Sequence, residues 1–196
     1  KNKVVVTGFG PFGEHDRNPS VDVAKDLEDH PPANCEVISK EMKVSYTEVS
    51  DTVPKLWEEH QPDLVVHIGV HSVKRCVKLE SQAFPDGYCR DDVDGCVPPN
   101  NKCDPNLEQT LKCAIDVDAL VERTKENVDK ILPKEFSIEK SCDPGRYLCG
   151  FSYYLSLCKD DTKCIFIHIP ILEDDVTIQL LSKIVSTVIE QIFENF

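Results

Sequence analysis

The chain has 196 residues, of which 40% are hydrophobic and 29% are charged, and its formal net charge is -13. This length and composition are those of an ordinary globular protein and predict a single domain over residues 1–196. The acidic balance would repel a phosphate backbone, so we expect no nucleic-acid partner. No apolar run approaches the roughly 20 residues that span a bilayer, so we expect no membrane partner either.

Strand and helix patterns alternate along the chain, which is typical of a sheet with helices on both faces. The predicted strands cover residues 3–9, 35–44, 64–70, 76–79, 136–140 and 164–169. The predicted helices cover residues 19–30, 47–60, 116–127 and 147–158, and a last helix ends at residue 194. In the first helix, Ser20 is the expected cap, and Val21, Ala24 and Leu27 are expected to face the core.

The pattern is lost between about residues 81 and 113, where Pro, Gly, Asp, Asn and Cys dominate. Such a stretch is too long for a plain connector in a compact domain, and long loops are usually functional or mobile. We therefore interpret it as an irregular, Cys-rich insertion in the single domain.

The ten cysteines bear on the compartment of the protein. No Cys-x-x-Cys pair indicates a structural zinc site, and several cysteines fall within predicted helices or strands, so we expect mostly reduced thiols. The open alternative is a disulfide within the insertion, among Cys89, Cys96, Cys103 and Cys113. The first residues lead directly into a strand without a visible signal peptide, which favours a cytoplasmic location and leaves open whether a leader precedes Lys1.

Cys149 is the first candidate for chemistry. It follows a loop that contains Pro144 and Gly145, and it falls in the first turns of a predicted helix. Unpaired amides and the helix dipole at such a position stabilise a thiolate. The alternative is a buried structural cysteine, which is the commoner role of a free cysteine.

His168 is the matching base. It closes the apolar run 164–167, and Pro170 ends the strand two residues later. Ligands of open sheets collect at the carboxyl ends of strands, so we expect His168 and Cys149 to meet at that edge. The alternative is a core histidine that is bonded to a backbone carbonyl.

A carboxylate should orient the imidazole of His168. Glu80, at the end of another predicted strand, is the best-placed candidate. Asp143, Glu173 and Asp174 rank lower because they fall in connecting loops.

The loop after the first strand contains glycines but has neither Gly-x-Gly-x-x-Gly nor Gly-Lys-Ser/Thr, and Pro11 removes an amide. Phosphate binding is therefore not expected there. Two aromatic side chains of this loop, Phe9 and Phe12, suggest instead a small, flat apolar pocket. For Phe9, ordinary core packing is the alternative.

Three stretches of this sequence together resemble the pyroglutamyl-peptidase I family of cysteine peptidases, the animal members more than the bacterial ones. They are residues 6–13 with 18–20, residues 145–149 with 153–154, and residues 166–172. The resemblance extends over nearly the whole chain. It implies an α/β/α sandwich around a mixed, mostly parallel sheet, removal of N-terminal pyroglutamate from peptides in the cytosol, and no metal or other cofactor.

The resemblance also implies the role of each site residue. Cys149 would be the nucleophile that forms a thioester, His168 the general base and then acid, and Glu80 the carboxylate that orients His168. The residues implied to bind the substrate are Phe9, Phe12, Asn18 and Tyr147. The insertion departs from the family apart from Gly87-Tyr88, and because it follows Glu80 directly, we expect it to cover the substrate cleft.

Two other hypotheses stay open. A different cysteine amidohydrolase, such as a glutamine-hydrolysing domain, would normally have a small residue two positions before the thiol, where this chain has Tyr147. A catalytically impaired binding protein for pyroglutamyl peptides is the second hypothesis, because the insertion differs from the family. The sequence does not decide between a monomer and a homo-oligomer.

Overall fold

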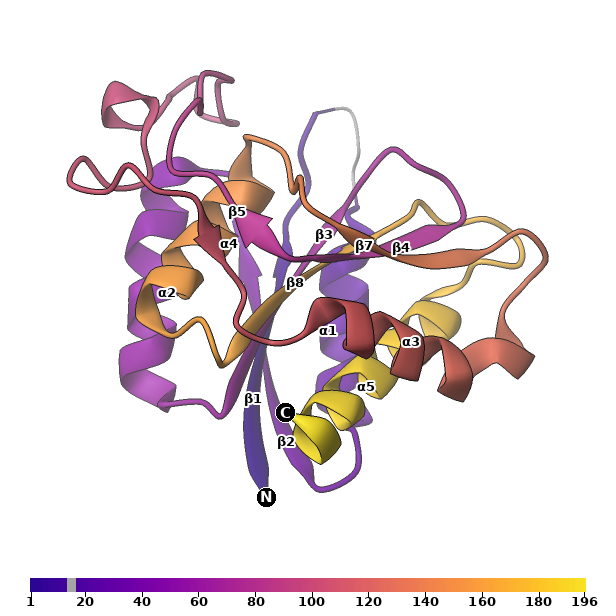
Figure 1. The fold of residues 1–196 in the computed structure, drawn as a ribbon. Helices are drawn as coiled ribbons and strands as arrows, with labels where there is room; N and C mark the ends of the chain where they lie inside the picture. The colour runs from indigo at the N-terminus through magenta and orange to yellow at the C-terminus, as the bar shows by residue number, and fades with distance from the viewer. Residues whose placement is uncertain (14–16) are drawn as a thin grey trace.

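The computed structural model describes residues 1–13 and 17–196, and its elements follow the predicted alternation of strands and helices (Figure 1). The strands are β1 (Asn2–Phe9), β2 (Cys35–Met42), β3 (Leu64–Val70), β4 (Cys76–Glu80), β5 (Gln82–Ala83), β6 (Leu111–Lys112), β7 (Ser137–Ser141) and β8 (Cys164–Ile169). The helices are α1 (Pro19–Asp29), α2 (Tyr46–His60), α3 (Val117–Val128), α4 (Leu148–Lys159) and α5 (Ile178–Asn195), with short 3-10 turns η1 (Pro99–Asn101) and η2 (Asp129–Ile131). The strand predicted for residues 35–44 ends at Met42, and the other bounds shift by about one residue.

The main sheet of the described residues has six strands in the order β2-β1-β3-β8-β4-β7. Neighbouring strands are parallel except for β4 and β8, which run antiparallel. Helices α2 and α4 pack together on one face, while α1, α3 and α5 cover the other (Figure 1). The expected three-layer α/β/α sandwich around a mixed, mostly parallel sheet is confirmed.

The central strands are apolar on both faces because helices cover both. Val66 and Ile68 of β3 belong to the core beneath α1 and α5, whereas Val65 belongs to the core beneath α2 and α4. Alternate residues of a strand point to opposite faces, so a continuous apolar run serves both layers. Phe166 of β8 lies fully buried on the α4 side, and this is the side on which the functional residues gather.

The start of α1 differs from the prediction. Asn18 is the cap: its side-chain oxygen accepts from the Ser20 amide at 3.0 Å, and Pro19 takes the first helical position, which it tolerates well. Ser20 is instead buried, and its hydroxyl accepts from the Phe9 amide at 2.9 Å. The prediction of Ser20 as the cap was therefore wrong.

The predicted buried stripe of α1 was also wrong in one position. Val21 is partly exposed, and Val23 is buried together with Ala24 and Leu27. Once Ser20 is buried at the helix start, residues three and four positions further along share its face.

The insertion is tied down at its base and along its length. β5 and β6 pair antiparallel and close the segment between them. Tyr88 is fully buried, and the buried carboxylate of Asp92 accepts from the amides of Tyr46, Asp94 and Cys96 at 2.9–3.0 Å. These contacts supply partners for a backbone that lacks regular ladders. The ten cysteines of the chain are free thiols in this structure.

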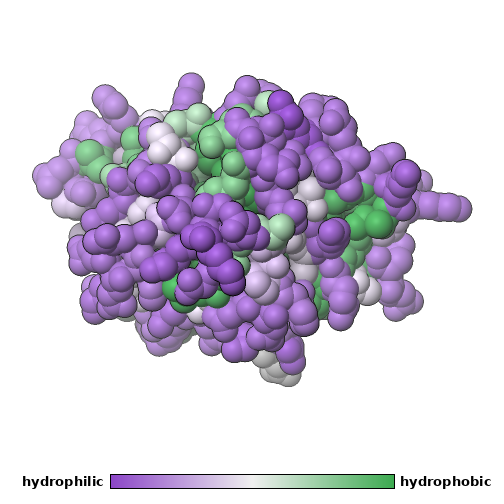
Figure 2. All heavy atoms as spheres, turned by 90° about the horizontal axis from the view of Figure 1, so that it is seen from below, coloured by the Kyte–Doolittle hydropathy of each residue, from purple (hydrophilic) through white to green (hydrophobic). Residues whose placement is uncertain are grey.

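The surface seen in Figure 2 is mostly hydrophilic, and apolar side chains gather only in separate patches. This agrees with the strongly acidic composition. In the described part of the chain, no helix combines the length and the apolar character that crossing a membrane requires.

His67, in the middle of β3, is fully buried within a chain of polar side chains. Its Nδ1 lies 2.6 Å from the Thr7 hydroxyl, and its Nε2 lies 2.6 Å from the Ser156 hydroxyl, which also accepts from the indole N–H of Trp57 at 3.0 Å. Burial lowers the pKa of His67 to about 3, so the ring is neutral in the folded protein at any ordinary pH.

This buried imidazole predicts a loss of stability in acid. In the unfolded chain, His67 binds a proton below its ordinary pKa of 6.5, whereas in the folded protein it stays neutral down to about pH 3. The free energy of unfolding therefore falls as the pH drops through this window. Between pH 7 and pH 5 the loss amounts to about 2 kcal/mol. Urea unfolding of His67→Gln should show a pH dependence that is smaller by this amount, while His30→Gln, at an exposed histidine, should behave like the wild type. Equal pH dependence in both variants would contradict the assignment.

Candidate active site

Cys149 is the second residue of α4 and is partly buried. The preceding loop is held by Asp143, whose side chain accepts from the Gly145 amide at 2.9 Å. No side chain caps the start of α4 in the described structure, so the first amides of the helix remain available beside the thiol. Gly150 permits this turn, because a Cβ at that position would lie 2.2 Å from the carbonyl oxygen of Gly145.

The thiol of Cys149 lies over Gly69, a position of the sheet that carries no side chain and thus leaves a gap for the sulfur. Gly69 of β3 pairs with His168 of β8, and a Cβ at Gly69 would lie 2.5 Å from the sulfur of Cys149 and 2.9 Å from the ring of Phe166. Distances this short are not reached by real Cβ atoms, so any other residue at position 69 would displace the sulfur or the ring. Sequence patterns did not indicate this role, because a glycine in an apolar strand has several explanations.

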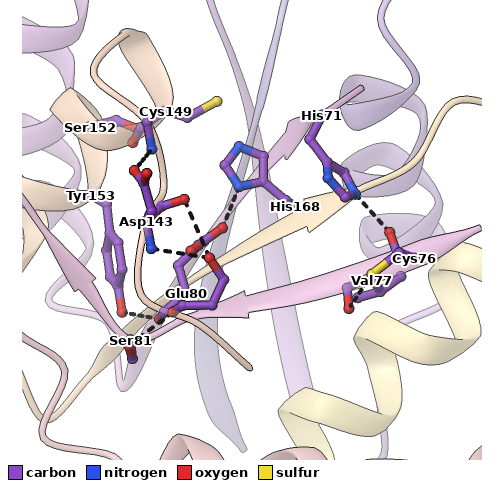
Figure 3. A network of polar contacts seen from close by, with 12 residues as sticks. His71, Cys76, Val77, Glu80, Ser81, Asp143, Cys149, Ser152, Tyr153 and His168 are labelled. Atoms are coloured by element: carbon purple, nitrogen blue, oxygen red, sulfur yellow. Dashed lines mark hydrogen bonds and ion pairs between the residues drawn. The ribbon is translucent and has the colours of Figure 1, made fainter. Parts of the chain in front are cut away.

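His168 and Glu80 meet across the one antiparallel pair of the main sheet, as Figure 3 shows. Glu80 lies opposite Phe166, two residues before His168, so the two side chains are diagonal neighbours on one face. Nδ1 of His168 lies 2.7 Å from Oε2 of Glu80, and both side chains are buried. We expected the site residues to meet because strand ends share the carboxyl edge of the sheet. Since β4 is antiparallel to β8, His168 and Glu80 meet instead through their diagonal pairing.

Charge strengthens this arrangement. Burial alone would lower the pKa of His168, but the sulfur of Cys149 and the carboxylate of Glu80 outweigh burial through hydrogen bonding and charge attraction and raise the pKa to about 9. The ring is therefore protonated at neutral pH, with its Nδ1 directed at Glu80. The second oxygen of Glu80, Oε1, is buried without a hydrogen-bond partner in the described structure, so this carboxylate depends on His168 for its stabilisation.

Aromatic side chains line two hollows of the surface near the start of α4. Tyr147 lies 6.1 Å from Phe12, measured between ring centroids, and the guanidinium of Arg90 lies 4.3 Å from the centre of the Tyr147 ring and 5.4 Å from that of Phe12. Phe12 borders two hollows, of about 690 Å³ and 310 Å³. Tyr147 and two residues of the insertion, Arg90 and Asp91, line the larger hollow.

The other two predicted pocket residues lie at the margin. Asn18 lines the smaller hollow, although its side-chain oxygen is committed to Ser20. Phe9 is 3% exposed and packs in the core, with one side facing a third hollow of about 300 Å³ that Asn18 also lines.

Among the residues that the structure describes, no group of three or more His, Cys, Asp or Glu side chains could hold a metal ion. A thiol at a helix start, beside a histidine that is bonded to a carboxylate, is the arrangement by which enzymes generate a cysteine nucleophile.

Comparison with known proteins agrees with this class. The model of the pyroglutamyl peptidase family PgaPase_1 matches residues 1–173. Human pyroglutamyl-peptidase 1 is 34% identical over 99% of this chain and 91% of its own length. Pyrrolidone-carboxylate peptidase of Pyrococcus furiosus is 27% identical over 89% of this chain and 83% of its own length. The chain belongs to the pyroglutamyl-peptidase family.

Solved structures share its fold. Pyrrolidone carboxyl peptidase of Thermococcus litoralis superposes with a TM-score of 0.83 at 20% identity, over 99% of this chain and 94% of that one. Pyroglutamyl peptidase I of Bacillus amyloliquefaciens gives a TM-score of 0.82 at 18% identity, over 96% and 95% of the two chains.

Glu80→Gln should lower the pKa of His168. The amide keeps the shape of the carboxylate but removes the negative charge that opposes burial, so we expect a fall of about one unit or more from the value near 9. Titration of the imidazole resonances by NMR, assigned with His168→Gln, measures this change. Glu36→Gln, on the exposed side of β2, is the matched control and should leave the His168 titration in place. An unchanged pKa in Glu80→Gln would show that the pair contributes nothing to the charge of the ring.

Gly69→Ala should destabilise the fold through the sulfur of Cys149. Overpacking of this kind costs about 1–3 kcal/mol. In a chain that already carries Cys149→Ala the sulfur is gone and only the contact with Phe166 remains, so the same change should cost clearly less. Urea unfolding of the four chains completes the cycle, and an equal cost in both backgrounds would mean that the sulfur does not occupy this gap.

Proposed function

We propose that this protein is a cysteine peptidase that removes N-terminal pyroglutamate from peptides, with Cys149 as nucleophile, His168 as general base and acid, and Glu80 as the orienting carboxylate. The observation that carries this proposal is the continuous arrangement from the thiol of Cys149 through His168 to Glu80, with a bond of 2.7 Å at its buried end. Family membership supports the substrate, since the relatives are named for this activity.

In the proposed reaction, the sulfur of Cys149 attacks the carbonyl carbon of the pyroglutamyl residue. The negative charge that develops on the carbonyl oxygen is stabilised by the uncapped amides at the start of α4. Protonated His168 then gives its proton to the departing amine, which leaves a thioester on Cys149. Water, deprotonated by the now neutral His168, hydrolyses the thioester and restores the site.

The aromatic wall of the cleft accounts for the choice of substrate. Pyroglutamate is a flat lactam without a charged amine, so its burial against Phe12 and Tyr147 costs little desolvation. A free N-terminus carries an ammonium group, and its burial there would cost much more. Phe9 and Asn18 are proposed to complete this pocket from the side of α1.

A cytoplasmic location and the single domain over residues 1–196 remain predictions, and oligomerisation is open.

Cys149→Ala should abolish hydrolysis of a fluorogenic pyroglutamyl amide under reducing conditions. Loss of a nucleophile typically lowers turnover by about 10⁴-fold or more. Cys96→Ala, which removes an exposed thiol of the insertion, is the matched control and should keep the wild-type rate. The corresponding proline amide should remain uncleaved by either chain.

Two outcomes would overturn the proposal. Binding of a pyroglutamyl peptide by folded wild-type protein without any cleavage would favour the impaired binding protein. Hydrolysis of glutamine without hydrolysis of pyroglutamyl amides would favour a different amidohydrolase.

A further inference from the structure

His71 is a titratable group next to the proposed catalytic residues that the reaction does not use. It follows β3 directly, and its amide donates to the carbonyl of Ile169 at 3.0 Å, which ties it to the end of β8. The centroid of its ring lies 5.6 Å from that of His168, and Figure 3 shows His168 between Cys149 and His71.

The ring of His71 is itself fixed. Its Nε2 lies 2.7 Å from the carbonyl oxygen of Cys76, at the start of the strand that carries Glu80. A carbonyl only accepts, so Nε2 carries the hydrogen and the neutral ring is held in one tautomer. His71 therefore joins the ends of β3 and β8 to the start of β4 beside the catalytic imidazole.

The charges around His71 favour its neutral form. Burial lowers its pKa, the bond to the Cys76 carbonyl opposes this, and the charge of His168 lowers it again. Lys78 on β4 acts in the same direction as His168, whereas Glu80 acts against it, and Arg17 lines the same hollow as His71. A neutral ring can pack against protonated His168 without repelling it.

The bond to Glu80 alone does not hold the catalytic ring in place. A single hydrogen bond at Nδ1 leaves the imidazole free to rock about that bond, which moves Nε2 away from sulfur. Phe166 contacts the ring at a centroid distance of 4.7 Å, and His71 provides the second aromatic contact. Displacement of a reacting group by about 1 Å is enough to cost up to about 100-fold in rate.

We propose that His71 is a positioning residue for the catalytic imidazole, a fixed ring that limits the movement of His168 and keeps its Nε2 directed at the sulfur of Cys149. This inference rests on the proposed function where it is tested by the rate of hydrolysis, but not where it is tested by the chemical reactivity of Cys149.

The chemical readout is the rate at which iodoacetamide alkylates Cys149 across pH 5 to 9, followed by mass spectrometry of the peptide that carries it. This rate reports the reactivity of the Cys149 sulfur beside His168 and needs no substrate. His71→Ala should lower it about tenfold at pH 7, a smaller effect than the limit for a displaced group. The exposed Cys96 in the same sample serves as the internal reference and should react as in the wild type.

Two more variants separate positioning from general damage. His71→Gln places an amide donor where Nε2 was, so the bond to Cys76 can form, and it should recover most of the lost alkylation rate. His71→Asn is too short to reach that carbonyl and should behave like His71→Ala, and it decides the question if the alanine variant fails to fold. His30→Ala, at an exposed histidine, is the matched control.

The kinetic readout is the hydrolysis of a pyroglutamyl amide. His71→Ala should lower kcat by about tenfold and leave KM within about threefold, as expected when the chemical step and not binding is impaired. A rise in KM with normal kcat and normal alkylation would make His71 only a wall of the pocket and overturn the inference, as would alkylation within twofold of the wild type in both short variants. If the wild type hydrolyses no pyroglutamyl amide while the alkylation rates of the variants differ as expected, the proposed function is refuted and the positioning role is retained.

Discussion

The buried bond between Glu80 and His168 is the interaction on which the rest of the site depends. A carboxylate and an imidazolium each lose their hydration in this part of the sheet, and neither is tolerable there without the other. The bond exists because β4 is inserted antiparallel beside β8, which makes the two residues diagonal neighbours. Among the strands that the structure describes, the antiparallel pairing of β4 with β8 is thus the place where the chain can hold two opposite charges out of water.

α4 connects this pair to the nucleophile. Cys149 lies in the first turn of the helix, and one turn later Tyr153 donates its hydroxyl to the backbone carbonyl of Glu80 at 2.8 Å. The same helix therefore positions the sulfur over the gap at Gly69 and holds the strand of the carboxylate. Because one rigid element carries both contacts, the distance between the two ends of the site does not depend on a loop.

Sequence patterns predicted the layers and most of the elements, because periodic burial in this chain is unambiguous. The sequence also pointed to Cys149, His168 and Glu80, since each stands near the end of a helix or strand, and the structure brings His168 and Glu80 into contact, while their catalytic roles stay predictions. The antiparallel direction of β4 was not predicted, because a five-residue strand reads the same in either direction. The cap at Asn18 was missed because Pro19 and Ser20 both suit a helix start, and only the burial of Ser20 decides between them.

The roles of residues that act through their neighbours in space could not be predicted from the sequence. Gly69 matters for the atom that it lacks, and His71 matters for a carbonyl and a ring that come from two other strands. Neither residue belongs to a local pattern. Such roles follow from which strands lie side by side, and that information is available only once the order of the sheet is known.

The insertion has a further physical consequence. Its ends are clasped by the short ladder of β5 and β6, so the segment between them is a closed loop whose conformational cost grows only with the logarithm of its length. Residues can be added or removed near its exposed turns without straining the sheet, while Asp92 and Tyr88 still anchor the wall of the cleft. The wall that the insertion provides at the larger hollow and the Cys149, His168 and Glu80 arrangement are therefore built by two different parts of the chain.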